Sequence, residues 1–166
     1  MTLFDNHGRP LNYLRLAVTD RCNLRCFYCM PANGINYLPK HNLLTFDEIE
    51  RLVALVATMG ITKLRLTGGE PFLRNDLMAL IQRIVRIKGI EQVHLTTNGV
   101  LTAPHVQSIK ALGIASINLS LDTLDRHRFA AITRRDAFDA VMKTFDAILS
   151  AGINLKVNAV VMDGQN

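Results

Sequence analysis

Three cysteines, the only ones in the chain, lie within one short segment at Cys22, Cys26 and Cys29. Thiolates are soft metal ligands, and three of them this close together can converge on one metal centre. A zinc ion would need a fourth ligand, and His7 and His41 are the candidates, although neither has a helpful spacing. A [4Fe–4S] cluster normally uses four cysteines, so three would leave one iron open to a ligand from outside the chain. The C-x3-C-x2-C spacing favours an iron–sulfur centre over zinc and over three buried free cysteines.

Short strands must position these cysteines. An alternating apolar stretch at residues 12–19 leads directly into the cysteine segment and predicts a strand. Four later segments begin with Gly-Ile and then alternate large apolar residues with polar ones. They lie at 60–67, 89–96, 113–120 and 152–159. A glycine that closes a helix, followed by a short strand, explains this repeat.

Helical stretches precede the repeated glycines. The first begins with Thr45 and Glu48, which fit a capping box, and then continues as an apolar stripe. Strands that alternate with helices predict a parallel sheet with right-handed crossovers. We therefore predict an α/β fold, a partial (β/α) TIM-like barrel of about five strand–helix units. Arg134 and Arg135, which precede the last helical stretch, are expected in a solvated loop.

Each predicted strand carries apolar residues on one face and polar residues on the other. Strands covered on both faces normally read as apolar throughout, so the polar faces indicate a shared interior. Three cations lie on these polar faces, at Arg15, Arg65 and Lys156. Thr96 and Ser120 share the same parity. A packed core does not tolerate unpaired cations, so this interior is expected to hold water or an anionic ligand. The alternative is simple exposure of the polar face to solvent.

Chemistry in such folds is placed at the carboxyl ends of the strands. The cysteine segment follows the first predicted strand. Three further polar segments, "TGGEP", "TTNG" and "SLD", follow the second, third and fourth strands. All four segments open at the same rim, so the sequence predicts one site there.

The composition is that of a globular protein. The chain has 166 residues, of which 49% are hydrophobic and 20% charged, enough for one domain over residues 1–166. No stretch approaches the ~18 apolar residues of a membrane helix. The first residues lack a signal-peptide pattern, so a cytoplasmic location with reduced thiols is expected. The net charge of +5 permits an anionic ligand, but no Lys/Arg block of the nucleic-acid-binding type is present.

Two hallmarks of the chain resemble one known superfamily. "CNLRCFYC" and "TGGEP" are similar to the two signatures of the radical S-adenosylmethionine (SAM) superfamily. The flanking "GRPLNYLRLAVTDRCNLRCFYCMP", "LRLTGGEPFLR", "LTTNG" and "INLSLD" resemble one family within it, the GTP 3′,8-cyclases. The resemblance covers nearly the whole chain. Those enzymes are radical SAM lyases that cyclise GTP in the first step of molybdenum cofactor biosynthesis.

The resemblance implies a role for particular residues. A [4Fe–4S] cluster would be bound by Cys22, Cys26 and Cys29, and its open iron would take the amino and carboxylate groups of SAM. SAM would also be contacted by Tyr28, Gly69 and Ser120, with Glu70 available to hold its ammonium group. At Gly69 a Cβ would block the ligand. GTP would be contacted by Arg15, Arg65, Thr96 and Lys156. An external electron donor would start the reaction, so no side chain is expected to act as acid, base or nucleophile.

The family's chains are longer and carry a C-terminal region with three more cysteines for a second cluster. We therefore expect this chain to be the SAM- and cluster-binding portion, truncated at its C-terminus. A homodimer is one oligomeric state that the sequence leaves open. Two other interpretations remain: a different radical SAM reaction on another anionic substrate, and a non-enzymatic, zinc-stabilised or metal-free α/β domain that binds partners.

Overall fold

The computed structural model of the chain describes residues 3–164 and 166. Its centre is one five-stranded sheet, in the order β1-β2-β3-β4-β5, with every neighbouring pair parallel. The strands are β1 (Tyr13–Ala17), β2 (Lys63–Thr67), β3 (Gln92–Thr97), β4 (Ser116–Ser120) and β5 (Leu155–Asn158). The order and direction that the alternating segments predict are therefore confirmed.

Helices connect the strands. The α-helices are α1 (Phe46–Thr58), α2 (Leu77–Ile84), α3 (Val106–Ala111), α4 (Arg126–Thr133) and α5 (Phe138–Ser150). Short 3-10 helices are η1 (Lys40–Asn42), η2 (Pro71–Leu73) and η3 (Ala103–His105). The predicted capping box at the start of α1 is confirmed, because the Glu48 amide donates to Thr45 Oγ1 and the Thr45 amide donates to a Glu48 carboxylate oxygen. The sequence did not predict α4.

The glycines of the repeat end the connections that lead into β2, β3, β4 and β5. All four have a positive φ, as a helix-terminating glycine requires: Gly60, Gly89, Gly113 and Gly152. They lie at the amino ends of the strands. The repeat therefore builds the edge of the sheet that is opposite to the cysteine segment.

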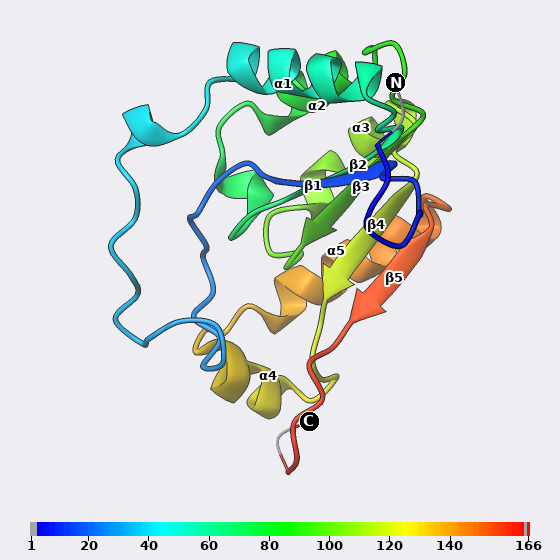
Figure 1. The fold of residues 1–166 in the computed structure, drawn as a ribbon. Coiled ribbons are helices and arrows are strands. Elements are labelled where there is room, and N and C mark those ends of the chain that lie inside the picture. Colours follow the sequence, from blue (N-terminus) through cyan, green and yellow to red (C-terminus); the bar gives the residue numbers. More distant parts are fainter. Residues whose placement is uncertain (1–2, 165) are drawn as a thin grey trace.

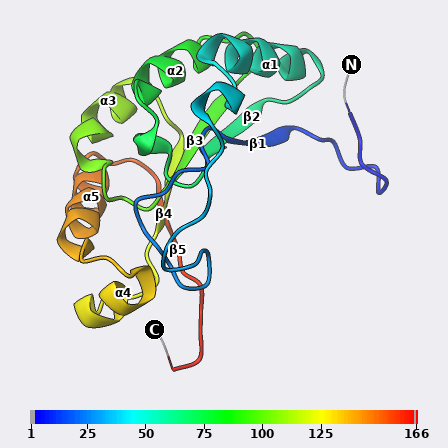
Figure 2. The same ribbon diagram turned by 90° about the vertical axis from the view of Figure 1, so that its left-hand side faces the viewer.

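Helices α1, α2, α3 and α5 cover only one face of the curved sheet (Figures 1 and 2). The apolar side of each strand packs against them, and the central side chains Leu64, Leu66, Leu95 and Ile117 are fully buried. Each such side chain contributes roughly 1.5–3 kcal/mol to folding. Burial of this row fixes the opposite, polar row on the concave face.

Among the described residues, no α-helix covers the concave face, and the cysteine-containing segment lies beside the carboxyl ends of the strands (Figures 1 and 2). Helices on one side and an open inner face are the arrangement of a partial barrel, as predicted. Within the described residues, no helix has the length and apolar character needed to span a membrane.

Candidate functional site

Strand register arranges the polar side chains of the concave face in three rows. Side chains two residues apart on a strand share a face and lie about 6.6 Å apart along it. The lower row consists of Arg15, Arg65, His94 and Ser116. The middle row contains Thr96, Asn118 and Lys156. The upper row contains Ser120 and Asn158, next to the cysteine segment.

Arg65 is held in place on the lower row by neighbours on both sides. Its Nε donates to the Tyr13 hydroxyl at 2.6 Å. Its Nη1 donates to the Leu95 carbonyl at 2.9 Å and lies 3.5 Å from Thr96 Oγ1. These contacts fix the guanidinium across β1, β2 and β3, and they join two of the predicted residues, Arg65 and Thr96. The sequence did not identify Tyr13 as a partner.

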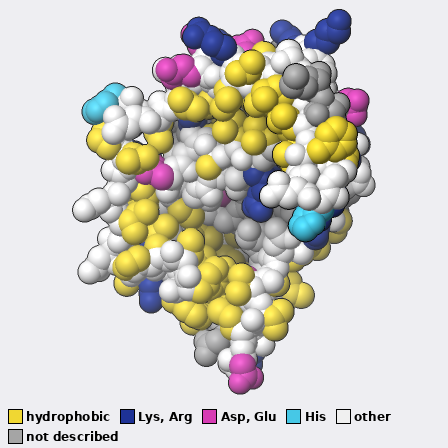
Figure 3. Space-filling view, in the orientation of Figure 1, with side chains coloured by type: hydrophobic (Ala, Val, Ile, Leu, Met, Phe, Trp, Pro, Cys, Tyr) yellow, Lys and Arg dark blue, Asp and Glu magenta, His cyan; other side chains and the backbone are white. Residues whose placement is uncertain are grey.

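Arg15 and Lys156 lie at the two ends of this arrangement. Both are exposed, and they belong to the two edge strands β1 and β5. In the space-filling view, Lys and Arg atoms occupy the middle of the hollowed face (Figure 3). Because the cations approach from several strands around a common hollow, this surface suits an extended anion better than a single small ion.

His94 is an additional titratable group on the lower row. Its Nδ1 lies 2.8 Å from Ser116 Oγ. Burial lowers the pKa of His94, and the positive charges of Arg65 and Lys63 lower it further. A neutral imidazole therefore lies beside the arginines, where it can donate or accept a hydrogen bond without adding charge.

Asp122, which follows Ser120 at the end of β4, brings Tyr28 to this end of the sheet. The Tyr28 hydroxyl donates to Asp122 Oδ2 at 2.8 Å, and Asp122 Oδ1 accepts from the Val160 amide at 2.9 Å. Burial raises the pKa of Tyr28, and the bond to Asp122 raises it further, so the hydroxyl stays protonated. Asp122 belongs to the "SLD" segment, whose place at the rim was predicted, although its contact with Tyr28 was not.

Helix α4 holds the cysteine segment in place. The Arg25 amide donates to the Thr133 carbonyl at 2.9 Å, and the Phe27 amide donates to the Ile132 carbonyl at 3.0 Å. The prediction that Arg134 and Arg135 lie in a solvated loop is confirmed, because both are exposed and form a bend after α4. The sequence did not predict that the Arg134 side chain donates to the Met30 carbonyl at 3.2 Å. The free carbonyls at the helix end therefore anchor the segment that carries the thiols.

The three thiols occupy different surroundings. Cys22 and Cys26 pack partly against an apolar cluster that includes Leu119 and Phe129, whereas Cys29 is exposed. Burial raises the pKa of Cys22, and it raises that of Cys26 to about 11. The negative charge of Cys29 raises the pKa of both thiols further. Three thiolates gathered in this way repel one another unless a metal centre neutralises them.

The donor set of the cysteine segment consists of three thiols, which is the ligand type that iron–sulfur clusters use. Among the described residues, no three Cys, His, Asp or Glu side chains are arranged to hold one metal ion. Zinc would need such a convergence on one point. In a cubane cluster each cysteine binds a different iron, so the sulfurs need only be neighbours. Cys22, Cys26 and Cys29 are free thiols, and the charge of Cys29 raises the pKa of both Cys22 and Cys26, so their chemistry is compatible with such a cluster.

Gly69 lies against the start of the cysteine segment. Its amide donates to the Thr19 carbonyl at 2.9 Å, and the next amide, of Glu70, donates to the Arg21 carbonyl at 2.7 Å. A Cβ at Gly69 would overlap the backbone of Arg21. The requirement for glycine thus has a reason within the chain itself, in addition to the ligand contact that the sequence predicts.

Glu70 does not face an open site, contrary to the expectation that it is available to an ammonium group. It is fully buried, and its carboxylate accepts from the Asn98 amide at 2.7 Å, Thr97 Oγ1 at 2.8 Å and the Phe72 amide at 3.1 Å. Burial raises its pKa, while these three donors act against that rise. Glu70 therefore ties the end of β2 to the end of β3.

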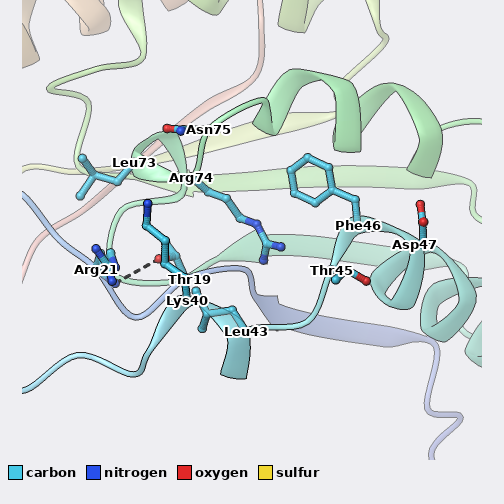
Figure 4. Close-up of a pocket in the computed structure, with 10 residues that line it drawn as sticks. All are labelled: Thr19, Arg21, Lys40, Leu43, Thr45, Phe46, Asp47, Leu73, Arg74 and Asn75. Atoms are coloured by element: carbon cyan, nitrogen blue, oxygen red, sulfur yellow. Dashed lines mark hydrogen bonds between the residues drawn. The ribbon is translucent and has the colours of Figure 1, made fainter.

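A cavity of about 500 Å³ lies beside the start of the cysteine segment (Figure 4). Arg74 extends across it and donates to the Val18 carbonyl at 2.6 Å and to the Leu44 carbonyl. The Arg74 guanidinium also stacks on the Phe46 ring. The lining includes Thr19 but none of the residues predicted to bind SAM or GTP. Arg74, which follows η2, thus links the end of β1 to the chain before α1.

Comparison with known protein families matches residues 16–166 to the radical SAM superfamily. The chain is also similar to two proteins named GTP 3′,8-cyclase. It is 46% identical over 164 residues to that of Thermodesulfovibrio yellowstonii, covering 98% of this chain and 51% of the relative. It is 47% identical over 166 residues to that of Erythrobacter litoralis, covering 99% and 50%. The chain spans about half the length of these curated relatives.

Among solved structures, the fold is similar to Streptococcus suis SuiB bound to S-adenosylmethionine. The TM-score is 0.73 at 22% identity, over 92% of this chain and 34% of that one. At this identity the likeness concerns the fold alone. It places the five strands and their helices within a partial barrel of the same kind.

Proposed function

Because the chain belongs to the radical SAM superfamily, we propose that it is the cluster- and SAM-binding part of a GTP 3′,8-cyclase. The observation that carries this proposal is 46% identity over almost the entire chain to a protein of that name. The cations of the concave face support the choice of GTP, because guanidinium groups bind phosphate oxygens well. An enzyme of this kind catalyses an early step of molybdenum cofactor biosynthesis.

The residues that bind the cluster, SAM and GTP would follow one another along the strand direction. Cys22, Cys26 and Cys29 would hold a [4Fe–4S] cluster at the upper end of the concave face. A bound cluster supplies one-electron chemistry toward SAM, the activity typical of this superfamily. Tyr28, Gly69 and Ser120 would bind and orient SAM beneath it.

GTP would lie on the two remaining rows. Arg15 and Arg65 of the lower row would bind phosphate oxygens through planar guanidinium groups. Thr96 and Lys156 of the middle row would complete the contacts. The fixed position of Arg65, bonded to Tyr13 and Leu95, would reduce the ordering cost of binding. We infer that these residues bind and orient GTP, and we assign no acid, base or nucleophile.

The electron would come from an external donor. We place the protein in the cytoplasm, because its three free thiols suit a reducing compartment.

Anaerobic reconstitution with iron and sulfide tests the first part of the proposal. We expect a visible absorption that dithionite bleaches, and loss of iron binding in Cys26→Ala. Tight zinc binding without iron uptake would instead favour the non-enzymatic interpretation.

GTP binding by the reconstituted chain tests the second part. We expect binding that weakens in both Arg15→Ala and Lys156→Ala. Cluster and SAM binding without any GTP binding would favour a different radical SAM reaction. These measurements concern binding rather than turnover, because the chain spans about half the length of the relatives named above.

A further inference from the structure

Asn98 directs a hydrogen bond at one of the three cysteines. It lies at the end of β3, in the "TTNG" segment, and is 8% exposed. Its Nδ2 donates to Cys22 Sγ at 3.7 Å and to Asn23 Oδ1 at 2.8 Å. Both hydrogens of the amide group thus point toward the start of the cysteine segment.

The orientation of this side chain is determined by its other contacts. Asn98 Oδ1 accepts from the Val100 amide at 3.0 Å, which requires the oxygen on that side and leaves the NH₂ group facing Cys22. The Asn98 backbone amide donates to the buried carboxylate of Glu70 at 2.7 Å. Glu70 therefore fixes the backbone of Asn98, whose side chain donates to Cys22.

A donor at a metal-bound sulfur changes the energy of the metal centre. When a cluster takes up one electron, negative charge on its cysteine sulfurs increases, and an N–H group directed at a sulfur stabilises the reduced state more than the oxidised one. Neighbours that orient or hydrogen-bond a ligand affect metal centres in this way generally.

We propose that Asn98 is a positioning residue that raises the reduction potential of the cluster held by Cys22, Cys26 and Cys29, and that Glu70 anchors it. The step concerned is the transfer of one electron from the external donor to the cluster, with no bond made or broken. This inference rests on the proposed function, since it requires the cluster to bind.

The test is a redox titration of the reconstituted chain, monitored by the electron paramagnetic resonance signal of the reduced cluster. In Asn98→Ala we expect the equilibrium constant for one-electron reduction to fall about threefold, or roughly 30 mV toward negative potential. Asn98→Asp keeps an oxygen for the Val100 amide but removes the N–H donor and adds negative charge. Its potential should fall at least as far.

Thr97→Val is the matched control. Thr97 is buried beside Asn98, and its hydroxyl bonds to Glu70, Thr102 and the Gly99 amide rather than to a cysteine sulfur. Its potential should stay near that of the parent chain, even if the variant is less stable. A shift in Thr97→Val equal to that in Asn98→Ala would overturn the proposal, because general loosening of the rim would then explain both.

The outcomes separate this inference from the proposed function. Failure of the parent chain to take up iron contradicts the proposed function. Normal iron content in either Asn98 variant, with an unchanged or more positive potential, overturns the role of Asn98 alone. Loss of iron binding in both variants also overturns it, because Asn98 would then be needed to build the site rather than to adjust its potential.

Discussion

Arg15 and Arg65 are register partners on the adjacent parallel strands β1 and β2, so two cations lie side by side on the concave face. Like charges in such a position repel each other and cost stability unless an anion lies between them. Pairs of this kind are typical of functional sites, where binding is favoured at the expense of folding.

Arg15→Ala should therefore change binding and stability in opposite directions. We expect GTP binding to weaken about tenfold or more, because a hydrogen bond to a charged group contributes roughly 1.5–3 kcal/mol. The thermal unfolding midpoint should stay the same or rise. Titration calorimetry and a thermal unfolding curve of the same sample measure the two effects.

Arg51→Ala supplies the control for net charge. Arg51 is exposed on α1, the helix that covers the opposite face of the sheet. If Arg51→Ala weakened GTP binding as much as Arg15→Ala, overall charge rather than the concave face would account for the affinity.

Gly69→Ala should abolish cluster binding. The new Cβ would overlap the Arg21 backbone, so the cysteine segment would have to move away from the end of β2. Gly113→Ala is the comparison, since its positive φ is strained in alanine but the space around it is open. We expect it to lose about 1 kcal/mol of stability and to bind iron normally. Equal iron content in the two variants would contradict this account of Gly69.

The stability of the chain should depend on pH through His94. Burial lowers the pKa of His94, and Arg65 and Lys63 lower it further, from an ordinary value of 6.5. Below that pH the unfolded chain binds the proton more readily than the folded chain. The stability that neutral His94 provides is thus complete above 6.5 and is lost as the pH falls toward the lower, folded value.

Urea unfolding at several pH values, compared between the parent chain and His94→Gln, isolates this contribution. We expect the parent to lose more stability than the variant between pH 7.5 and pH 5.5. Parallel curves for the two proteins over this range would show that His94 does not titrate as described.

The anchoring of the cysteine segment on α4 should be visible without any metal. The amides of Arg25 and Phe27 donate to carbonyls at the end of α4, so their hydrogen exchange should be slow in the metal-free chain. Ile35, an exposed residue later in the same segment, is the reference for fast exchange. Equal rates at all three amides would mean that only the metal orders the segment.

The sequence predicted the sheet and its polar face because both follow from local alternation. A strand such as Lys63–Thr67 buries Leu64 and Leu66, and this alone places Arg65 on the other face. The capping box at Thr45 and the repeated glycines are equally local signals. For the same reason the predicted rim segments all lie at one edge of the sheet.

Contacts between distant segments could not be predicted in this way. The buried residues of α4 are Phe129, Ile132 and Thr133, too few to produce a clear apolar stripe, so the helix that anchors the cysteines was missed. The burial of Glu70 depends on how the ends of β2 and β3 meet. From the sequence alone, an acidic residue after two glycines was predicted to bind a ligand, because its burial between the two strand ends is not a local signal.

The separation of the two edges of the sheet has a consequence for how such a chain can vary. The glycine turns at the amino ends of β2–β5 lie away from the cysteine segment, so a longer turn there leaves the three rows in register. One residue added within a strand would instead exchange its inward and outward side chains beyond that point. Related chains should therefore differ in the length of the turns at the amino ends of the strands. The interiors of the strands should accept substitutions but not insertions.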